Sequence, residues 1–192
     1  MKIRLAAPLQ FDSIVDGEGL RTVLWTQGCL RNCPACHNPH THNLDAGFLV
    51  DLDDLKKELS EIELQAGLTL SGGEPFLQPE PLIELARFAH QELGWNVWAF
   101  SGFTYEQLMG KKTKPSPFEL QSKNLPPAPN FFHPLDPDAA SLAPLRRQLL
   151  QEIDVLVDGP FILAERNLEL SFRGSNNQRL LRLKNGKIKK IE

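Results

Sequence analysis

The chain has 192 residues, a net charge of −3 and a hydrophobic fraction of 41%. This length suits one domain with its own core, and the hydrophobic fraction excludes wholesale disorder. The charge gives no electrostatic reason to expect a nucleic acid or an anionic membrane as partner. We find no apolar run long enough to span a membrane and no secretory signal, so we expect a cytoplasmic protein with a single domain over residues 1–192.

Short apolar runs alternate with amphipathic segments along the chain. In chain order, the expected elements are a strand at 22–27, a helix at 51–65, a strand at 68–71, a helix at 79–94, a strand at 96–100, a short helix from Thr104, a helix at 142–153 and a strand at 154–159. Leu55, Leu59 and Ile62 share one face of the first helix. This alternation predicts a parallel α/β sheet or barrel. A full eight-fold barrel needs about 250 residues, so we expect an incomplete, open one.

The last third of the chain departs from this alternation. Residues 110–140 hold many prolines and show no periodicity, which is typical of loops that are functional or flexible. Two interpretations stay open: a tolerated, flexible surface insertion, or a lid or docking loop that uses Phe131, Phe132 and His133. Further on, "LELSFR" and "QRLLRL" predict two strands, and the Asn-Gly pair in "KNGK" predicts a hairpin turn.

All three cysteines of the chain lie within eight positions, at Cys29, Cys33 and Cys36. An odd number at such close spacing argues against disulfides, and unpaired thiols fit a reducing cytoplasm. Soft thiolates select iron–sulfur clusters, zinc or copper(I). A structural zinc ion needs a fourth ligand, for which the nearby candidates are His37, His40 and His42. A cubane cluster normally takes four cysteines, so three would leave one iron open to a substrate. Both readings stay open at this point.

Motifs follow three of the expected strands. The cysteine loop follows residues 22–27, the "SGGEP" stretch follows 68–71, and Ser101-Gly102 follows 96–100. Because the carboxyl ends of parallel strands meet at one edge of a sheet, these loops are expected to converge there. The glycines would allow a ligand to approach the backbone closely, and Glu74 would accept hydrogen bonds from an ammonium group.

These motifs carry a family resemblance. C-x3-C-x2-C after one strand and GGEP after the next resemble the radical S-adenosylmethionine (SAM) superfamily. Within it, "SIVDGEGLRTVLWTQGCLRNCPACHNPHTH" is similar to the activating enzymes of glycyl-radical proteins. "DVLVDGPF" and "LSFRGSNNQR" resemble the activators of anaerobic ribonucleoside-triphosphate reductase. The resemblance runs from Phe11 to Leu183, apart from the insertion, and implies an open parallel β/α barrel of the radical SAM type.

The resemblance also implies ligands. Cys29, Cys33 and Cys36 would hold one 4Fe–4S cluster, whose fourth iron is chelated by the amino and carboxylate groups of SAM. The GGEP loop would receive the methionine end, and the residues beside the last cysteine would pack the adenine. The implied SAM-binding residues are Ala35, Cys36, His37, Gly72, Gly73, Glu74, Ser101 and Gly102. We also expect Arg21 to reach the SAM carboxylate.

The implied reaction is a reductive cleavage. One electron from the reduced cluster breaks SAM into methionine and a 5′-deoxyadenosyl radical, which abstracts a Cα hydrogen from a glycine of a partner protein. The implied partner is an anaerobic ribonucleotide reductase, and the implied electron donor is a flavodoxin or ferredoxin. No catalytic side chain beyond the cluster and SAM is needed for this chemistry.

Two alternatives remain. One is a radical SAM enzyme acting on a small molecule, such as a carboxy-deazaguanine synthase, which "CHNP" and "FRGSNNQR" count against. The other is a non-catalytic iron–sulfur or zinc module, which GGEP counts against.

Other polar and aromatic residues receive ordinary interpretations. The residues expected to be solvated or to cap helices are His40, His42, His90, Arg146, Arg147 and the terminal "KNGKIKK". The tryptophans expected in the core and sheet are Trp25, Trp95 and Trp98. Two readings stay open for Arg173, Asn176, Asn177 and Arg179: a turn, or a role near the site or partner.

Overall fold

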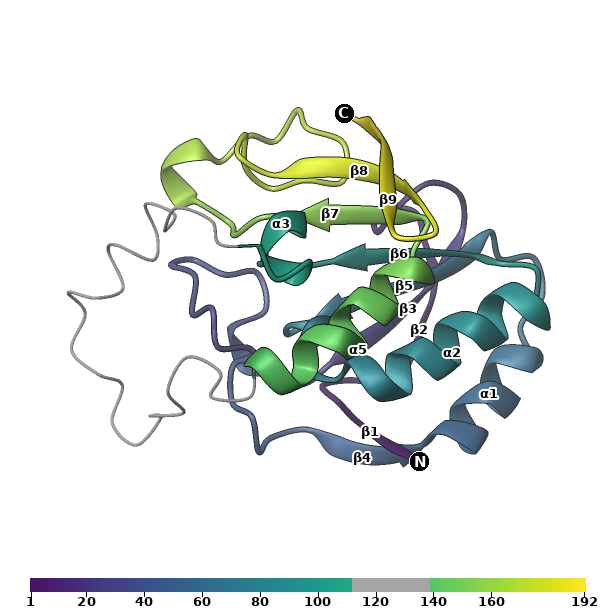
Figure 1. Cartoon of the computed structure of the whole chain (residues 1–192). Coiled ribbons are helices and arrows are strands. Elements are labelled where there is room, and N and C mark those ends of the chain that lie inside the picture. Colours follow the sequence, from purple (N-terminus) through teal and green to yellow (C-terminus); the bar gives the residue numbers. More distant parts are fainter. Residues whose placement is uncertain (112–138) are drawn as a thin grey trace.

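One mixed sheet runs through the computed structural model, which describes residues 1–111 and 139–192 (Figure 1). Its strands are β1 (Lys2–Leu5), β2 (Gln10–Ser13), β3 (Arg21–Thr26), β4 (Phe48–Asp51), β5 (Gly67–Gly72), β6 (Asn96–Phe100), β7 (Val155–Asp158), β8 (Arg179–Lys184) and β9 (Lys187–Ile191). They lie in the order β4-β1-β3-β5-β6-β7-β8-β9, and β2 also pairs with β3. The four central strands, β3, β5, β6 and β7, are parallel, and the strands on both sides are antiparallel. The α/β class is therefore confirmed, and the described sheet is open, ending at β4 and β9.

Three helices, α1 (Leu52–Ser60), α2 (Pro79–Gln91) and α5 (Ala139–Gln151), cover one face of the sheet (Figure 1). Helix α2 begins with Pro79, whose fixed φ suits the first helical turn, and it buries Leu82, Leu85 and Ala86. The short helix α3 (Tyr105–Leu108) follows β6 and begins at a capping box formed by Thr104 and Gln107. The apolar spacing and the caps therefore explain where these helices lie.

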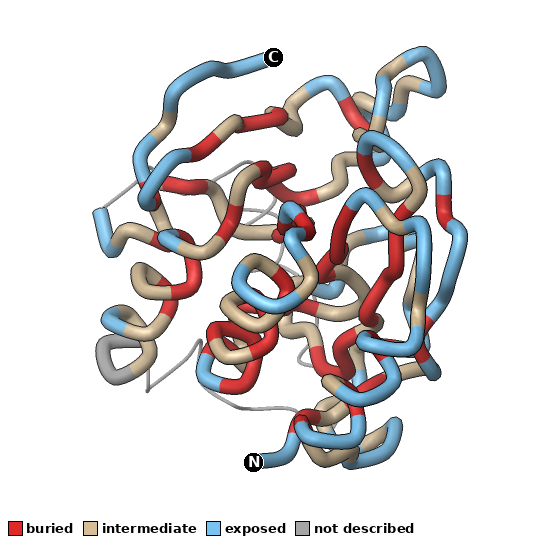
Figure 2. Tube along the Cα trace, turned by 90° about the vertical axis from the view of Figure 1, so that its right-hand side faces the viewer, coloured by how far each residue is buried: buried red, intermediate tan, exposed pale blue. Residues whose placement is uncertain are grey.

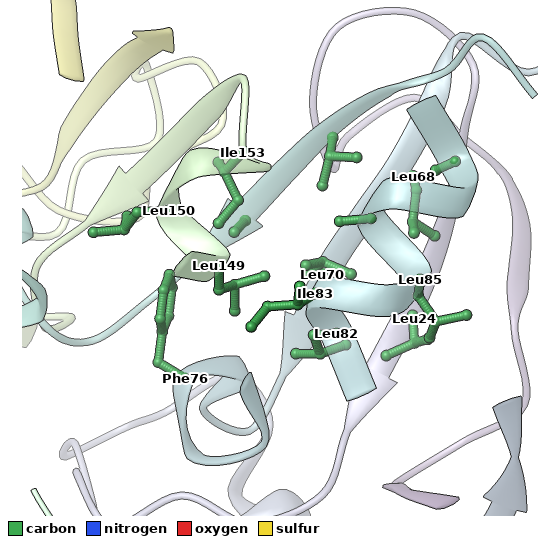
Figure 3. Close-up of a cluster of buried hydrophobic side chains, with 14 of the residues drawn as sticks. Leu24, Leu68, Leu70, Phe76, Leu82, Ile83, Leu85, Leu149, Leu150 and Ile153 are labelled. Carbon is green, nitrogen blue, oxygen red and sulfur yellow. The ribbon is translucent and has the colours of Figure 1, made fainter. Parts of the chain in front are cut away.

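The main core fills the space between the sheet and these helices. Figure 3 shows side chains of α2 and of the end of α5 facing the strands. The residues labelled there are Leu24, Leu68, Leu70, Phe76, Leu82, Ile83, Leu85, Leu149, Leu150 and Ile153. A smaller cluster, Trp98, Val155, Val157 and Leu180, covers the opposite face of the sheet. Figure 2 shows that the buried segments are concentrated in the central strands and the inner sides of the helices.

Most elements agree with the sequence predictions to within a few residues, but three differ. The first helix ends at Ser60 instead of residue 65, and Leu64, with a φ of 62°, lies in the turn that leads to β5. The expected strand over "LELSFR" is wrong, since residues 168–173 form turns. The N-terminal strands β1, β2 and β4 were not predicted; β2 is mostly exposed and β4 has no buried residue, so neither shows a buried apolar run.

The predicted hairpin at the C-terminus is confirmed. Strands β8 and β9 are antiparallel, and Asn185 and Gly186 join them with φ of 50° and 68°. Positive φ at both positions is what a tight hairpin turn requires. The proline-rich insertion lies, for residues 112–138, outside the described residues, and so do the lid residues Phe131, Phe132 and His133. None of the helices in the described ranges has the length and hydropathy of a membrane span.

Candidate metal centre

The loops after β3 and β5 are bound to each other at the carboxyl edge of the parallel strands. The backbone N–H of Gly73 donates to the carbonyl oxygen of Thr26 at 2.8 Å, and that of Glu74 donates to the carbonyl oxygen of Gly28 at 2.8 Å. Gly28 in turn donates to Thr41, on the far side of the cysteine loop, at 2.9 Å. The "SGGEP" loop is thus attached to the residue that directly precedes Cys29.

The backbone of the "SGGEP" loop approaches the backbone around Thr26 and Gly28 so closely that both of its glycines are required. A Cβ atom at Gly73 would lie 2.3 Å from the carbonyl oxygen of Gly28. Gly72 has a φ of 100°, and a Cβ there would lie 2.5 Å from the backbone nitrogen of Thr26. Only glycine fits at either position. The two glycines therefore have a structural task, which is to let the cysteine loop and the loop after β5 touch through their backbones.

The Glu74 side chain points into the protein, and its carboxylate links two loops. Its Oε1 accepts hydrogen bonds from the N–H of Phe76 at 3.1 Å and from the hydroxyl of Ser101 at 2.9 Å, and its Oε2 accepts one from the N–H of Gly102 at 2.8 Å. The side chain is 1% exposed, and burial raises its pKa. We expected the Glu74 carboxylate to accept hydrogen bonds from an ammonium group. In the structure, this carboxylate accepts hydrogen bonds from three protein donors instead.

The three cysteines are half-buried, unpaired thiols on the loop after β3. Burial, followed by the neighbouring Glu74 carboxylate, raises the pKa of Cys29 to about 12. Burial also raises the pKa of Cys33, while the Sγ of Cys36 accepts a hydrogen bond from the N–H of Asn38 at 3.4 Å. The raised pKa keeps Cys29 and Cys33 neutral by themselves, and a bound metal would supply the positive charge that ionises them.

The donor set fits a cluster better than a single ion. In residues 1–111 and 139–192, no three His, Cys, Asp or Glu side chains converge in a way that would hold one metal ion. A tetrahedral zinc ion needs four such ligands, and of the three candidate histidines His37 and His40 are exposed and His42 is half-buried. None of these histidines forms such a group with two of the cysteines in the described ranges. A cubane cluster takes each thiolate on a different iron, so its ligands need not converge on one point.

The remaining residues of the implied SAM set surround this edge. Ala35 and His37 are exposed on either side of Cys36, and Ala35 has a φ of 57°. Ser101 is buried and donates to Glu74, while Gly102 is partly exposed. The structure thus gathers all the loops of the predicted set at one edge of the sheet.

Sequence reasoning missed two arginines that hold these loops together. Arg31, inside the cysteine loop, donates to the carbonyl oxygen of Gly102, and its guanidinium lies 4.7 Å from the centroid of the Phe103 ring. Arg146 of α5 lies 5.1 Å from the same centroid, and its Nε donates to the carbonyl oxygen of Phe76 at 2.9 Å. Arg146 is 6% exposed, so the expectation of a solvated side chain is wrong.

Arg21 is at the opposite end of the strands. It is the first residue of β3, fully buried, and donates to the hydroxyl of Thr69 at 2.6 Å, the carbonyl of Leu68 at 2.8 Å and the side chain of Asn96 at 2.9 Å. Because the cysteine loop leaves the carboxyl end of β3, the expectation that Arg21 reaches a SAM carboxylate there is wrong. Its role is to join the starts of β3, β5 and β6.

The C-terminal polar residues mostly support the loop after β7. The side-chain amide of Asn177 donates to the carbonyl oxygen of Pro160 at 2.8 Å. Arg179 pairs with Asp158 at 2.5 Å and with Glu106 of α3 at 2.8 Å. The loop that they support lies near the cysteines, because the backbone of Phe161 partly offsets the burial that raises the pKa of the Cys33 thiol. Arg173 is exposed and donates to the carbonyl oxygen of Glu192, and the side chain of Asn176 accepts from Asn167.

The fold and the site define a class: an α/β protein with a three-thiol loop for an iron–sulfur cluster at the carboxyl edge of its parallel strands. Residues 15–120 and 138–181 match the family model described as a 4Fe-4S single cluster domain. The chain is 31% identical over 180 residues to an anaerobic ribonucleoside-triphosphate reductase-activating protein of Pasteurella multocida, which covers 88% of this chain and 91% of that protein. The relative of the same name in Salmonella typhimurium is 28% identical over 173 residues, covering 86% and 90%.

A third relative is similar over a shorter stretch. The pyruvate formate-lyase-activating enzyme of Clostridium pasteurianum is 39% identical over 84 residues, which cover 41% of this chain and 35% of that enzyme. The chain belongs to the 4Fe-4S single cluster domain family and to the family of anaerobic ribonucleoside-triphosphate reductase-activating proteins.

Proposed function

We propose that this chain is a radical SAM activase that generates a glycyl radical on a partner enzyme, an anaerobic ribonucleotide reductase. The observation that carries the proposal is the direct backbone contact between Glu74 of the GGEP loop and Gly28, the residue before the first cysteine. This contact joins the cluster-binding loop to the loop that receives SAM in the family the sequence resembles. The names of the relatives support the choice of partner.

Cys29, Cys33 and Cys36 would hold a 4Fe–4S cluster, and the open position on its fourth iron would take SAM. When bound, the cluster supplies the electron that cleaves SAM reductively. The residues proposed to contact SAM are Ala35, Cys36, His37, Gly72, Gly73, Glu74, Ser101 and Gly102. For Glu74 the proposed contact is through its backbone, since its carboxylate is occupied by protein donors.

The protein's part in the reaction is to orient and enclose. The loops after β3, β5 and β6 are tied together by backbone bonds and by Glu74, which fixes the cysteines relative to the proposed SAM position. Because hydrogen-atom transfer requires no side-chain acid or base, we assign none. The parallel strands would form an incomplete radical SAM barrel, whose open side leaves room for a glycine-bearing loop of the partner. A flavodoxin- or ferredoxin-type protein would supply the electron.

Two measurements test this function. After anaerobic reconstitution with iron and sulfide, the protein should bind four irons per chain and, with dithionite, convert SAM to 5′-deoxyadenosine and methionine. Mixed with an anaerobic ribonucleotide reductase and SAM, it should produce a doublet in electron paramagnetic resonance (EPR) that collapses when the reductase carries α-deuterated glycine. If no reductase gives the signal while a small molecule accelerates SAM cleavage, the small-molecule alternative replaces the activase reading.

A further inference from the structure

Arg31 lies between the first two cysteines and connects their loop to the loop after β6. Its guanidinium donates to the carbonyl oxygen of Gly102 and lies over the ring of Phe103, 4.7 Å from the centroid. Arg31 lies two residues from both Cys29 and Cys33 in the sequence, and its charge partly offsets the burial that raises the pKa of the Cys33 thiol. A single residue therefore belongs to the cysteine loop and contacts the neighbouring loop through its side chain.

The neighbourhood of Arg31 restricts where its charge can lie. A Cβ at Gly102 would lie 2.9 Å from Cγ of Arg31, so this glycine leaves room for the arginine stem. The ring of Phe103 is also contacted by Arg146, which is buried and bonded to Phe76. Stacking and the planar donor fork of arginine together hold the guanidinium beside the cysteines.

A fixed cation at this place has a consequence for an electron-accepting group. One-electron reduction adds a negative charge to a 4Fe–4S cluster, and a nearby positive charge stabilises the reduced state. The buried Glu74 carboxylate, which also lies near the cysteines, acts in the opposite direction. The positive charge of Arg31 offsets this effect of the Glu74 carboxylate.

We propose that Arg31 is a positioning residue whose fixed charge raises the reduction potential of the cluster and whose stacking on Phe103 holds the cysteine loop in place. The proposal rests on the cluster of the proposed function. It concerns a residue outside both the thiol ligands and the implied SAM contacts.

The test compares the parent protein with Arg31→Gln, Arg31→Lys and Arg87→Gln after anaerobic reconstitution. Arg87 of α2 is the matched control, because it pairs with Glu152 at 2.8 Å and is not part of the cysteine loop. Iron content is measured first, and the cluster is then titrated with dithionite and redox mediators, one electron per cluster, while EPR follows the reduced form. At a fixed potential, Arg31→Gln should lower the ratio of reduced to oxidised cluster about tenfold, or about 59 mV for a one-electron couple. Arg87→Gln should match the parent, and Arg31→Lys, which keeps the charge but lacks the planar fork, should lower the potential by less than Arg31→Gln does.

Each outcome decides the matter. An Arg31→Gln protein with four irons and the parental potential overturns the inference. If that variant holds no cluster, Arg31→Lys decides: a cluster whose potential is less than about 59 mV below that of the parent supports the role of the charge, and a lost cluster or a larger fall in potential refutes it. A parent protein without a four-iron cluster refutes the proposed function itself.

Discussion

The structure makes Glu74 the residue whose replacement most directly tests how the site is held. Removing the carboxylate with Glu74→Ala leaves three donors without their acceptor, on Phe76, Ser101 and Gly102. Glu74→Gln keeps the shape and one acceptor oxygen, but its amide group places a donor against one of the three donors. The two variants therefore remove different numbers of the same bonds.

Hydrogen bonds to a charged group contribute about 1.5–3 kcal/mol each, so three bonds set an upper limit of about 9 kcal/mol. The raised pKa of Glu74 shows that desolvation takes back part of this gain. We therefore expect Glu74→Ala to lower the free energy of unfolding by about 3–4 kcal/mol and Glu74→Gln by about 1.5–2 kcal/mol. Affinity for SAM should fall in the same order, because the loops that would hold it lose their link.

The same carboxylate makes stability depend on pH. Its pKa in the folded protein is raised above the ordinary value of 4.5, so the folded protein binds the proton more tightly than the unfolded chain does. The free energy of unfolding therefore falls as the pH rises from about 4.5 to the raised folded pKa. Glutamine cannot titrate, so in Glu74→Gln the free energy of unfolding should no longer fall over this range of pH.

Urea unfolding of the cluster-free, reduced protein, followed by circular dichroism, measures these effects. The matched control is Glu58→Ala, an exposed glutamate of α1, which should change stability by less than about 0.5 kcal/mol. If Glu74→Ala is as stable as this control, the three hydrogen bonds do not hold the loops together and our account of the site is wrong. Equal losses in the alanine and glutamine variants would refute the assignment of the individual acceptors.

Three further predictions concern other parts of the molecule. Cys33→Ser should abolish the cluster, since a hydroxyl is a poor ligand for a soft metal; full iron content in that variant, or tetrahedral zinc in the freshly isolated protein, would contradict the cluster assignment. Arg21→Met should lower the free energy of unfolding by about 3 kcal/mol, measured with urea, because it leaves buried acceptors unpaired. The folded variant should still bind SAM as the parent does. If SAM affinity falls while the fold is intact, Arg21 contacts SAM after all. Hydrogen bonding to Asp154 raises the pKa of His90, so this pair should stabilise the protein fully below the ordinary histidine value of 6.5 and lose its contribution as the pH rises through the folded pKa. If the stability of His90→Gln falls as steeply with pH as that of the parent, the His90–Asp154 pair does not make this contribution.

The sequence by itself determined the central strands, the helices that cover them and the cysteine motif. Each of these signals is local: β-branched runs, helical spacing, and three soft ligands within eight positions. The order of motifs along the chain also predicted that the loops after β3, β5 and β6 meet at one edge, because parallel strands place their carboxyl ends together.

Only the tertiary structure decided what the polar side chains do. Arg21 begins a strand, so its place is at the edge opposite the cysteines, although it lies in the stretch that resembles the activating enzymes. Glu74 turns inward because three donors from two loops meet there. Arg31 and Arg146 find their partners at separations of 71 and 70 residues, which no local pattern encodes. Such contacts arise only when the sheet brings distant loops together, and for that reason the proposed ligands could be predicted from the sequence and the residues that support them could not.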